Sequence, residues 1–270
     1  MKRHLLIDIT WYLAVFLLIQ TGVYIAGSLL CKALSLPQSA TLTAATSAVS
    51  SLLTIATFTW RKWAVASIGT ARGPLWVVTL CACLLAVGCT SPMSYLLETC
   101  RLELPSAYQQ QFTAIMQHDL GYICIAVLVP IAEELVFRGA ILRRLLDTMG
   151  HGRRWIAIAA TALLFGTVHG NMAQGVNATV IGLLLGWMYV RTGSLLPCMA
   201  FHWTNNTVAY LAFRLMPGAS DMSLTDLYGG DPQRVALSLI FSLMIAAGAA
   251  YQIHAITAHK AATGHGKGAS

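Results

Sequence analysis

Charged residues are scarce in this chain. Only 10% of its 270 residues are Asp, Glu, Lys or Arg, whereas 57% are hydrophobic. A soluble domain carries about 25% charged residues, so this composition excludes an ordinary soluble enzyme or binding domain. It indicates an all-α, polytopic membrane protein, and one compact helical unit is the simplest organisation.

Local motifs that would assign a site at once are also absent. The seven cysteines include no CxxC pair, and most of them lie inside apolar segments. A zinc ribbon or a thiol redox site is therefore not supported, and the cysteines are better explained as small apolar side chains. Neither an HExxH zinc motif nor a GxSxG serine motif occurs in the sequence.

The sequence instead contains about eight apolar segments. Several reach the roughly 20 residues that a helix needs to cross a ~30 Å hydrocarbon core. The fifth is short, so we expect it to begin earlier or to end at a break near Gly170. In the sixth, Gly182 and Gly186 are four residues apart, which predicts close helix packing. The expected spans are residues 9–31, 41–60, 74–97, 120 through the Glu133–Glu134 pair, 155–168, 175–190, 194–213 and 235–256.

The distribution of Lys and Arg predicts the orientation of these spans. If the N-terminus is cytoplasmic and eight spans alternate, twelve of the 17 basic residues lie in cytoplasmic segments and four lie outside. Arg138 is the remaining one. Because cytoplasmic loops are enriched in Lys and Arg, we expect both termini in the cytoplasm. The net charge of +7 is then a feature of topology, and we expect no nucleic-acid partner.

Three charged residues lie at the end of the fourth apolar segment. A charge at bilayer depth costs at least ~2.5–3.5 kcal/mol on insertion scales, so Glu133, Glu134 and Arg138 require an explanation. Glu134 and Arg138 are four residues apart and can pair on one helix face. That pair could serve only to fix the register of the helix. Glu133 points about 100° away and has no local cation, which makes it a candidate functional carboxylate.

Further polar residues occur in two later segments. His169 ends the fifth segment, four residues after Phe165, while His202 and Asn206 are four apart in the seventh. A helix–helix hydrogen bond would explain His169 alone equally well. His202 and Asn206 share one helix face, which predicts that they line a common polar cavity.

Together these groups could activate a water molecule. A carboxylate in a low-dielectric cavity can act as a general base, and a histidine beside it can hold the water. A second histidine and an amide can donate to a developing oxyanion, so the set could hydrolyse a peptide or another acyl bond. Two His and two Glu could equally hold a divalent metal such as zinc. The candidate metal ligands are Glu133, Glu134, His169 and His202.

Three spaced patterns carry a family resemblance. In chain order they are Glu133-Glu134-x-x-x-Arg138, Phe165-x-x-x-His169 and His202-x-x-x-Asn206. On separate apolar segments they resemble the CAAX protease and bacteriocin-processing (CPBP or Abi) family, which includes the type II CAAX prenyl endopeptidase. The resemblance covers residues 120–210, and the first three spans are similar only in being apolar helices.

The resemblance implies an intramembrane endopeptidase. Its implied catalytic residues are Glu133 and His169, which activate the water, and His202 and Asn206, which form the oxyanion site. The implied supporting residues are Glu134, Arg138 and Phe165. Family members are described both as metalloproteases and as metal-free glutamate proteases, so a zinc cofactor stays open.

The resemblance also suggests the partners and the location. We expect membrane lipid and a peptide or lipidated protein as partners, in a bacterial cytoplasmic membrane. The alternatives are a proton- or ion-coupled transporter and a catalytically silent membrane scaffold. The expected divisions are an N-terminal part over 1–118, a catalytic core over 119–214, an outer loop with the last span over 215–258, and a disordered tail over 259–270.

Overall fold

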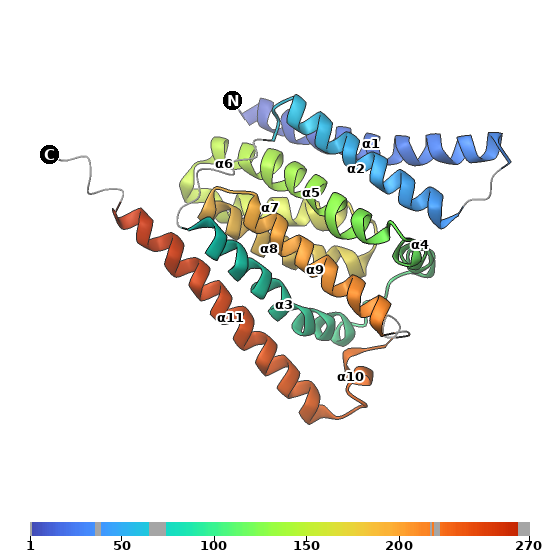
Figure 1. Ribbon diagram of the computed structural model, residues 1–270. Coiled ribbons are helices and arrows are strands. Elements are labelled where there is room, and N and C mark those ends of the chain that lie inside the picture. Colours follow the sequence, from blue (N-terminus) through green and yellow to red (C-terminus); the bar gives the residue numbers. More distant parts are fainter. Residues whose placement is uncertain (1, 36–38, 65–73, 217, 219–221, 264–270) are drawn as a thin grey trace.

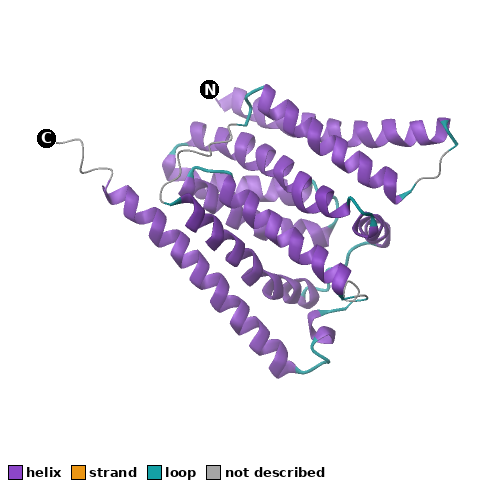
Figure 2. Cartoon of the chain, in the orientation of Figure 1, coloured by secondary structure: helices purple, strands orange, loops and turns teal. Residues whose placement is uncertain are grey.

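The fold is known from a computed structural model that describes residues 2–35, 39–64, 74–216, 218 and 222–263. All regular secondary structure in these residues is helical (Figure 2), which confirms the all-α prediction. The elements are α1 (Lys2–Ala33), α2 (Ala40–Trp60), α3 (Leu75–Thr99), α4 (Ser106–Gln117), η1 (Ile123–Leu128), α5 (Val129–Glu134), η2 (Leu135–Leu142), α6 (Arg143–Met149), η3 (His151–Arg153), α7 (Arg154–Thr167), α8 (Met172–Thr192), α9 (Leu196–Leu215), α10 (Leu224–Leu227) and α11 (Pro232–Thr263).

Each of the eight expected apolar segments forms a helix. Five described helices are long and apolar enough to cross a membrane, namely α1, α2, α3, α8 and α11. The chain is therefore an integral membrane protein, and the count of eight spans stays a prediction. With 14 residues, α7 is about 21 Å long at 1.5 Å per residue, and its chain breaks at Gly170, where φ is 70°.

Two parts of the chain are more helical than expected. The connection between α3 and the fourth segment contains α4, a 12-residue helix that begins directly after Pro105. The last helix continues through Thr263, so it includes the first residues of the predicted tail. Residues 264–270 of that tail lie outside the described residues, and the predicted domain boundaries remain untested.

The helices are arranged around a central helix that runs without a break from residue 121 to residue 149. We call it the motif helix, and it comprises η1, α5, η2 and α6. The pair α1–α2 packs on one side of it, and α9 and α7 pack on it elsewhere, with α3 and α11 together at the far side of α9 (Figure 1). All eight residues of η2 are buried, so the core of the bundle lies around this segment.

Small residues bring α7 and α8 close together beside the motif helix. A Cβ atom on Gly182 would lie 3.1 Å from Cα of Ala162, and one on Gly186 would lie 2.9 Å from Cγ2 of Ile158. Both approaches are tighter than side chains normally make. The close packing predicted from the Gly182–Gly186 spacing is confirmed. It places α8 directly against α7, the helix that carries Phe165.

Candidate active site

The motif helix is widened on both sides of the two glutamates. Residues of η1 and η2 form π-helical turns, and the six-residue α5 lies between them. Pro130 has no backbone N–H and its ring displaces the preceding turn, which gives a local reason for the wide turn before it. Such π segments are frequent at functional sites. Glu133 and Glu134 therefore lie in a short regular segment between two irregular ones.

The predicted ion pair between Glu134 and Arg138 forms. Arg138 Nη1 donates to Glu134 Oε1 at 2.8 Å, and both side chains are fully buried. The guanidinium also donates to the Gly182 carbonyl at 3.4 Å. It lies over the Phe165 ring, 4.6 Å from its centroid, in a cation–π contact. Arg138 thereby connects the motif helix to α7 and α8.

His202 on α9 connects the two carboxylates. Its Nδ1 lies 3.0 Å from Glu134 Oε1, and its Nε2 lies 3.6 Å from Glu133 Oε2. An ionised carboxylate only accepts hydrogen bonds, so Nδ1 carries the proton that it donates to Glu134. At 3.6 Å the second approach is too long for a good hydrogen bond. Glu133 is therefore close to His202 without a short hydrogen bond to it.

His169 lies at the end of α7 and turns its ring toward Phe165. Its Nδ1 is 2.8 Å from the Phe165 carbonyl oxygen, which only accepts, so Nδ1 is the donor. In the neutral imidazole, Nε2 is then an acceptor. The Phe165 ring makes edge contacts with His169 and His202, at centroid distances of 5.0 Å and 6.0 Å. Phe165 thus lies between both histidines and Arg138, which is consistent with the supporting role expected of it.

The structure does not pair Glu133 with His169 directly. In the part of the chain that the structure describes, no hydrogen bond joins their side chains. The resemblance implied that these two residues act on one water, so any such water must bridge them. Glu133 has an exposed side-chain fraction of 14%, which leaves its side chain partly accessible.

Asn206 has a structural partner that the sequence prediction missed. Its Nδ2 donates to the Ile125 carbonyl at 2.9 Å. In η1 the bonds run five residues back, as Val129 N–H to Cys124 carbonyl shows. The next donor in that series would be residue 130, which is proline and has no N–H. Asn206 therefore satisfies a carbonyl that Pro130 leaves free, and one N–H of its amide remains for another acceptor.

Other polar residues near the site were also missed. Trp203 Nε1 donates to the Tyr122 hydroxyl at 3.1 Å, and that hydroxyl lies 3.3 Å from Thr207 Oγ1. The Tyr108 hydroxyl of α4 donates to the Gly170 carbonyl at 3.4 Å. The i, i+4 spacing of Trp203 and Thr207 on the face next to His202 was the available signal. These contacts fasten α9 to the motif helix and α4 to the end of α7.

The four candidate metal ligands do not form a metal site in this arrangement. Among the described residues, no group of three or more His, Cys, Asp or Glu side chains is placed to hold a metal ion. A catalytic zinc typically takes three protein ligands, and His202, which directs Nδ1 to Glu134, has only Nε2 to offer as one of them. However, Glu134 Oε2 is buried without a hydrogen-bond partner in the described part of the chain. As placed, the described residues do not bring three of these candidate ligands together, and a zinc cofactor stays a prediction.

Comparison with known proteins assigns the segment that carries these residues. Residues 119–208 match the family model described as type II CAAX prenyl endopeptidase Rce1-like. This segment is similar to the CAAX protease family, and we call it the CAAX protease segment. The match spans about a third of the chain and includes Glu133, His169, His202 and Asn206, so the predicted resemblance is confirmed. No curated protein and no solved structure matched the chain.

The boundaries of the CAAX protease segment agree with the packing of the bundle. The segment begins just before the motif helix and ends within α9. It therefore contains the ion pair, both histidines and the amide, while α1–α4, α10 and α11 lie outside it. Glu133, Glu134, Arg138, Phe165, His169, His202 and Asn206 all lie in the CAAX protease segment.

Proposed function

We propose that this protein is an intramembrane endopeptidase of the CAAX type, in which Glu133 is the general base. The observation that carries this proposal is the geometry of Glu133. Its carboxylate is partly accessible, lies 3.6 Å from His202 Nε2 and has no hydrogen bond of its own within the described residues. The neighbouring Glu134, by contrast, is held through Oε1 by both Arg138 and His202. One carboxylate is held by the structure, and the other is available for chemistry.

The proposed reaction begins with one water molecule between Glu133 and His169. The water donates one hydrogen bond to the Glu133 carboxylate and the other to Nε2 of His169, which is the acceptor nitrogen. Glu133 takes a proton as the water oxygen attacks the carbonyl carbon of the scissile peptide bond. Phe165 supports this geometry because its carbonyl fixes the His169 tautomer.

The tetrahedral intermediate is stabilised and then collapses. The remaining N–H of Asn206 donates to the oxyanion, and His202 can donate from Nε2 when that nitrogen carries a proton. Glu133 then returns its proton to the leaving amine nitrogen as the C–N bond breaks, so no proton is gained or lost overall. Glu134 and Arg138 act by holding His202 in position through Nδ1.

The proposed substrate is a membrane-associated or lipidated peptide or protein. The site lies within a bundle of apolar helices, so a scissile bond must reach it from the membrane. The name of the matched family model suggests a prenylated chain end. A peptide series with and without a prenyl group would show whether the lipid is required.

The decisive experiment measures cleavage by the purified full-length chain. Wild type, Glu133→Gln and the control Glu103→Gln, whose side chain is exposed, are incubated with prenylated and unprenylated peptides. General acid–base groups contribute about 10²–10⁴-fold, so Glu133→Gln should lose at least about a hundredfold in turnover. Its Tm should equal that of wild type, because the amide keeps the volume of the side chain. Unchanged turnover in Glu133→Gln would overturn the proposal.

The same samples address the cofactor. Metal content and the effect of a chelator are measured alongside cleavage. Cleavage that persists without metal would support a glutamate protease. Stoichiometric zinc with chelator-sensitive cleavage would require Glu133, Glu134, His169 and His202 to rearrange into a ligand set, and it would overturn the metal-free mechanism. Solute flux without any cleavage would instead favour a transporter.

We further propose eight spans with both ends in the cytoplasm of a bacterial cell. The twelve-to-four distribution of basic residues supports this orientation. It places Cys100, which is exposed directly after α3, outside the membrane. A membrane-impermeant maleimide should therefore label the wild-type protein at Cys100 in intact cells. The Cys100→Ser variant should lose this labelling. Labelling only after lysis would contradict the orientation.

A further inference from the structure

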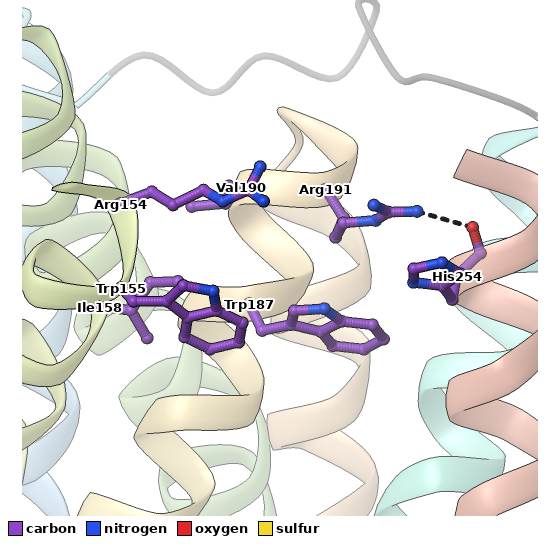
Figure 3. A pocket seen from close by; sticks show the side chains of 7 residues that line it. All are labelled: Arg154, Trp155, Ile158, Trp187, Val190, Arg191 and His254. Atoms are coloured by element: carbon purple, nitrogen blue, oxygen red, sulfur yellow. Dashed lines mark hydrogen bonds between the residues drawn. The ribbon is translucent and has the colours of Figure 1, made fainter. Parts of the chain in front are cut away.

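A second pocket lies apart from the Glu133 site. It has a volume of about 200 Å³ and lies among α7, α8 and α11 (Figure 3). None of the site residues described above lines it, and α11 is outside the CAAX protease segment. The mechanism proposed for peptide cleavage gives this pocket no role, so its lining requires a separate explanation.

The pocket is positively charged. Arg154 of α7 and Arg191 of α8 line it, and its lining contains no acidic residue. Arg191 Nε donates to Thr257 Oγ1 at 2.9 Å, and its Nη2 donates to the His254 carbonyl at 2.7 Å. These bonds fix one guanidinium against α11. Arg154 is exposed and makes no ion pair among the described residues, so its charge is available to an anion.

The pocket lies near the start of α7 and near the ends of two candidate spans, those of α8 and α11. Arg154 is the first residue of α7, and Arg191 is the second-last residue of the candidate span Met172–Thr192. His254 is close to the end of the candidate span Pro232–Ala258. Because the ends of membrane spans lie near the lipid headgroups, we infer that the two arginines lie at headgroup level.

Aromatic side chains complete this arrangement. Trp155 and Trp187 line the pocket with the arginines, and Figure 3 shows both indole rings below the two guanidinium groups in that view. Tryptophan is enriched at the level of lipid headgroups. The lining thus has charged groups at one end and aromatic surface beside them. A lipid has the same order, with a charged headgroup followed by its glycerol and acyl region.

We propose that this pocket binds the phosphate group of an anionic lipid headgroup. Basic pockets between membrane helices are a known way to bind anionic headgroups, and arginine is suited to phosphate because of its planar set of donors. A volume of about 200 Å³ is smaller than the ~300–1,000 Å³ of pockets that enclose drug-sized ligands. It therefore suits a headgroup with its chains outside. The proposal does not depend on the proposed protease activity.

The test measures lipid binding by the full-length chain in detergent, using native mass spectrometry. Phosphatidylglycerol, phosphatidylcholine and inorganic phosphate are titrated against wild type, Arg154→Gln and the matched control Arg153→Gln. Arg153 is the exposed neighbour that does not line the pocket. A basic residue near the membrane contributes about fivefold to anionic-lipid affinity, so we expect about that loss in Arg154→Gln and a clearly smaller one in Arg153→Gln.

Further outcomes separate a lipid from a free anion. Trp155→Leu, at a position that is 57% exposed, should weaken phosphatidylglycerol binding without changing the Tm. Equal losses of phosphatidylglycerol affinity in the Arg153 and Arg154 variants would show general charge attraction and would overturn the assignment of the pocket as the binding site. Binding of inorganic phosphate with the same dependence on Arg154, and no preference for phosphatidylglycerol, would overturn the lipid assignment. Because the readout is binding, a failure here leaves the protease proposal untouched.

Discussion

The motif helix and the outermost helices of this protein use apolar residues in opposite ways. All eight residues of η2 are buried, whereas the most apolar windows of α1 and α11 are only 6% and 11% buried. Without water around them, the outer helices gain little from burying apolar side chains, because lipid is equally apolar. The central helix gains its specificity from packing and from polar contacts. The difference shows that hydropathy identifies the outer helices and that polar residues identify the core.

The two regions also differ in how much an ion pair contributes to stability. Glu134 and Arg138 are both fully buried at 2.8 Å. Asp231 and Arg234, at the start of α11, are 40% and 71% exposed at 3.2 Å. An exposed pair contributes little because water screens it. A buried pair leaves an uncompensated charge when one partner is removed.

The largest predicted effect on stability is that of Arg138→Ala. Removal of the guanidinium leaves Glu134 buried without its cation, at a cost of ~3–5 kcal/mol. It also removes the contacts to Gly182 and Phe165. The Tm in detergent should fall markedly. In the matched variant Arg234→Ala, the Tm should change by little, since an exposed pair contributes ~0–1 kcal/mol. Equal Tm values for the two variants would contradict the claim that the buried ion pair stabilises the fold more than the exposed one.

A second prediction concerns glycine in the two regions. In Gly182→Ala the new Cβ would lie 3.1 Å from Ala162 and 3.4 Å from Arg138 Nη2. Overpacking of this kind costs ~1–3 kcal/mol, so we expect a lower Tm. In Gly248→Ala, on α11, the new Cβ meets nothing within 4 Å, so the Tm should not fall. If Gly182→Ala unfolds at the wild-type temperature, α7 and α8 are less tightly packed than the structure shows.

Much of the site could be predicted because its residues obey helix spacing. Glu134 and Arg138 are four residues apart, and so are His202 and Asn206, which makes each pair visible in the sequence. Their placement in apolar segments is conspicuous because charges are rare there. The helices followed from apolar length for the same reason.

The remaining features depend on contacts that no local pattern encodes. The contact of His202 with Glu134 joins residues 68 positions apart. The bond from Asn206 to Ile125 depends on the π-helical register of η1, which sequence periodicity does not reveal. The helix α4 was not predicted because its 12 residues are too few for a membrane span. Tertiary packing decided each of these features.

The smallest predicted effect on stability is at the contact between α1 and α2, which a hydrogen bond joins. Ser50 Oγ donates to Gln20 Oε1 at 2.8 Å, while the buried Ser51 Oγ has no hydrogen-bond partner in the described part of the chain. Hydrogen bonds between membrane helices average ~0.6 kcal/mol, so Ser50→Ala should lower the Tm slightly. Ser51→Ala should not lower it, because no bond is lost and an unpaired hydroxyl is removed. A loss at Ser51 as large as that at Ser50 would mean that general packing, rather than this bond, holds the outer helices together.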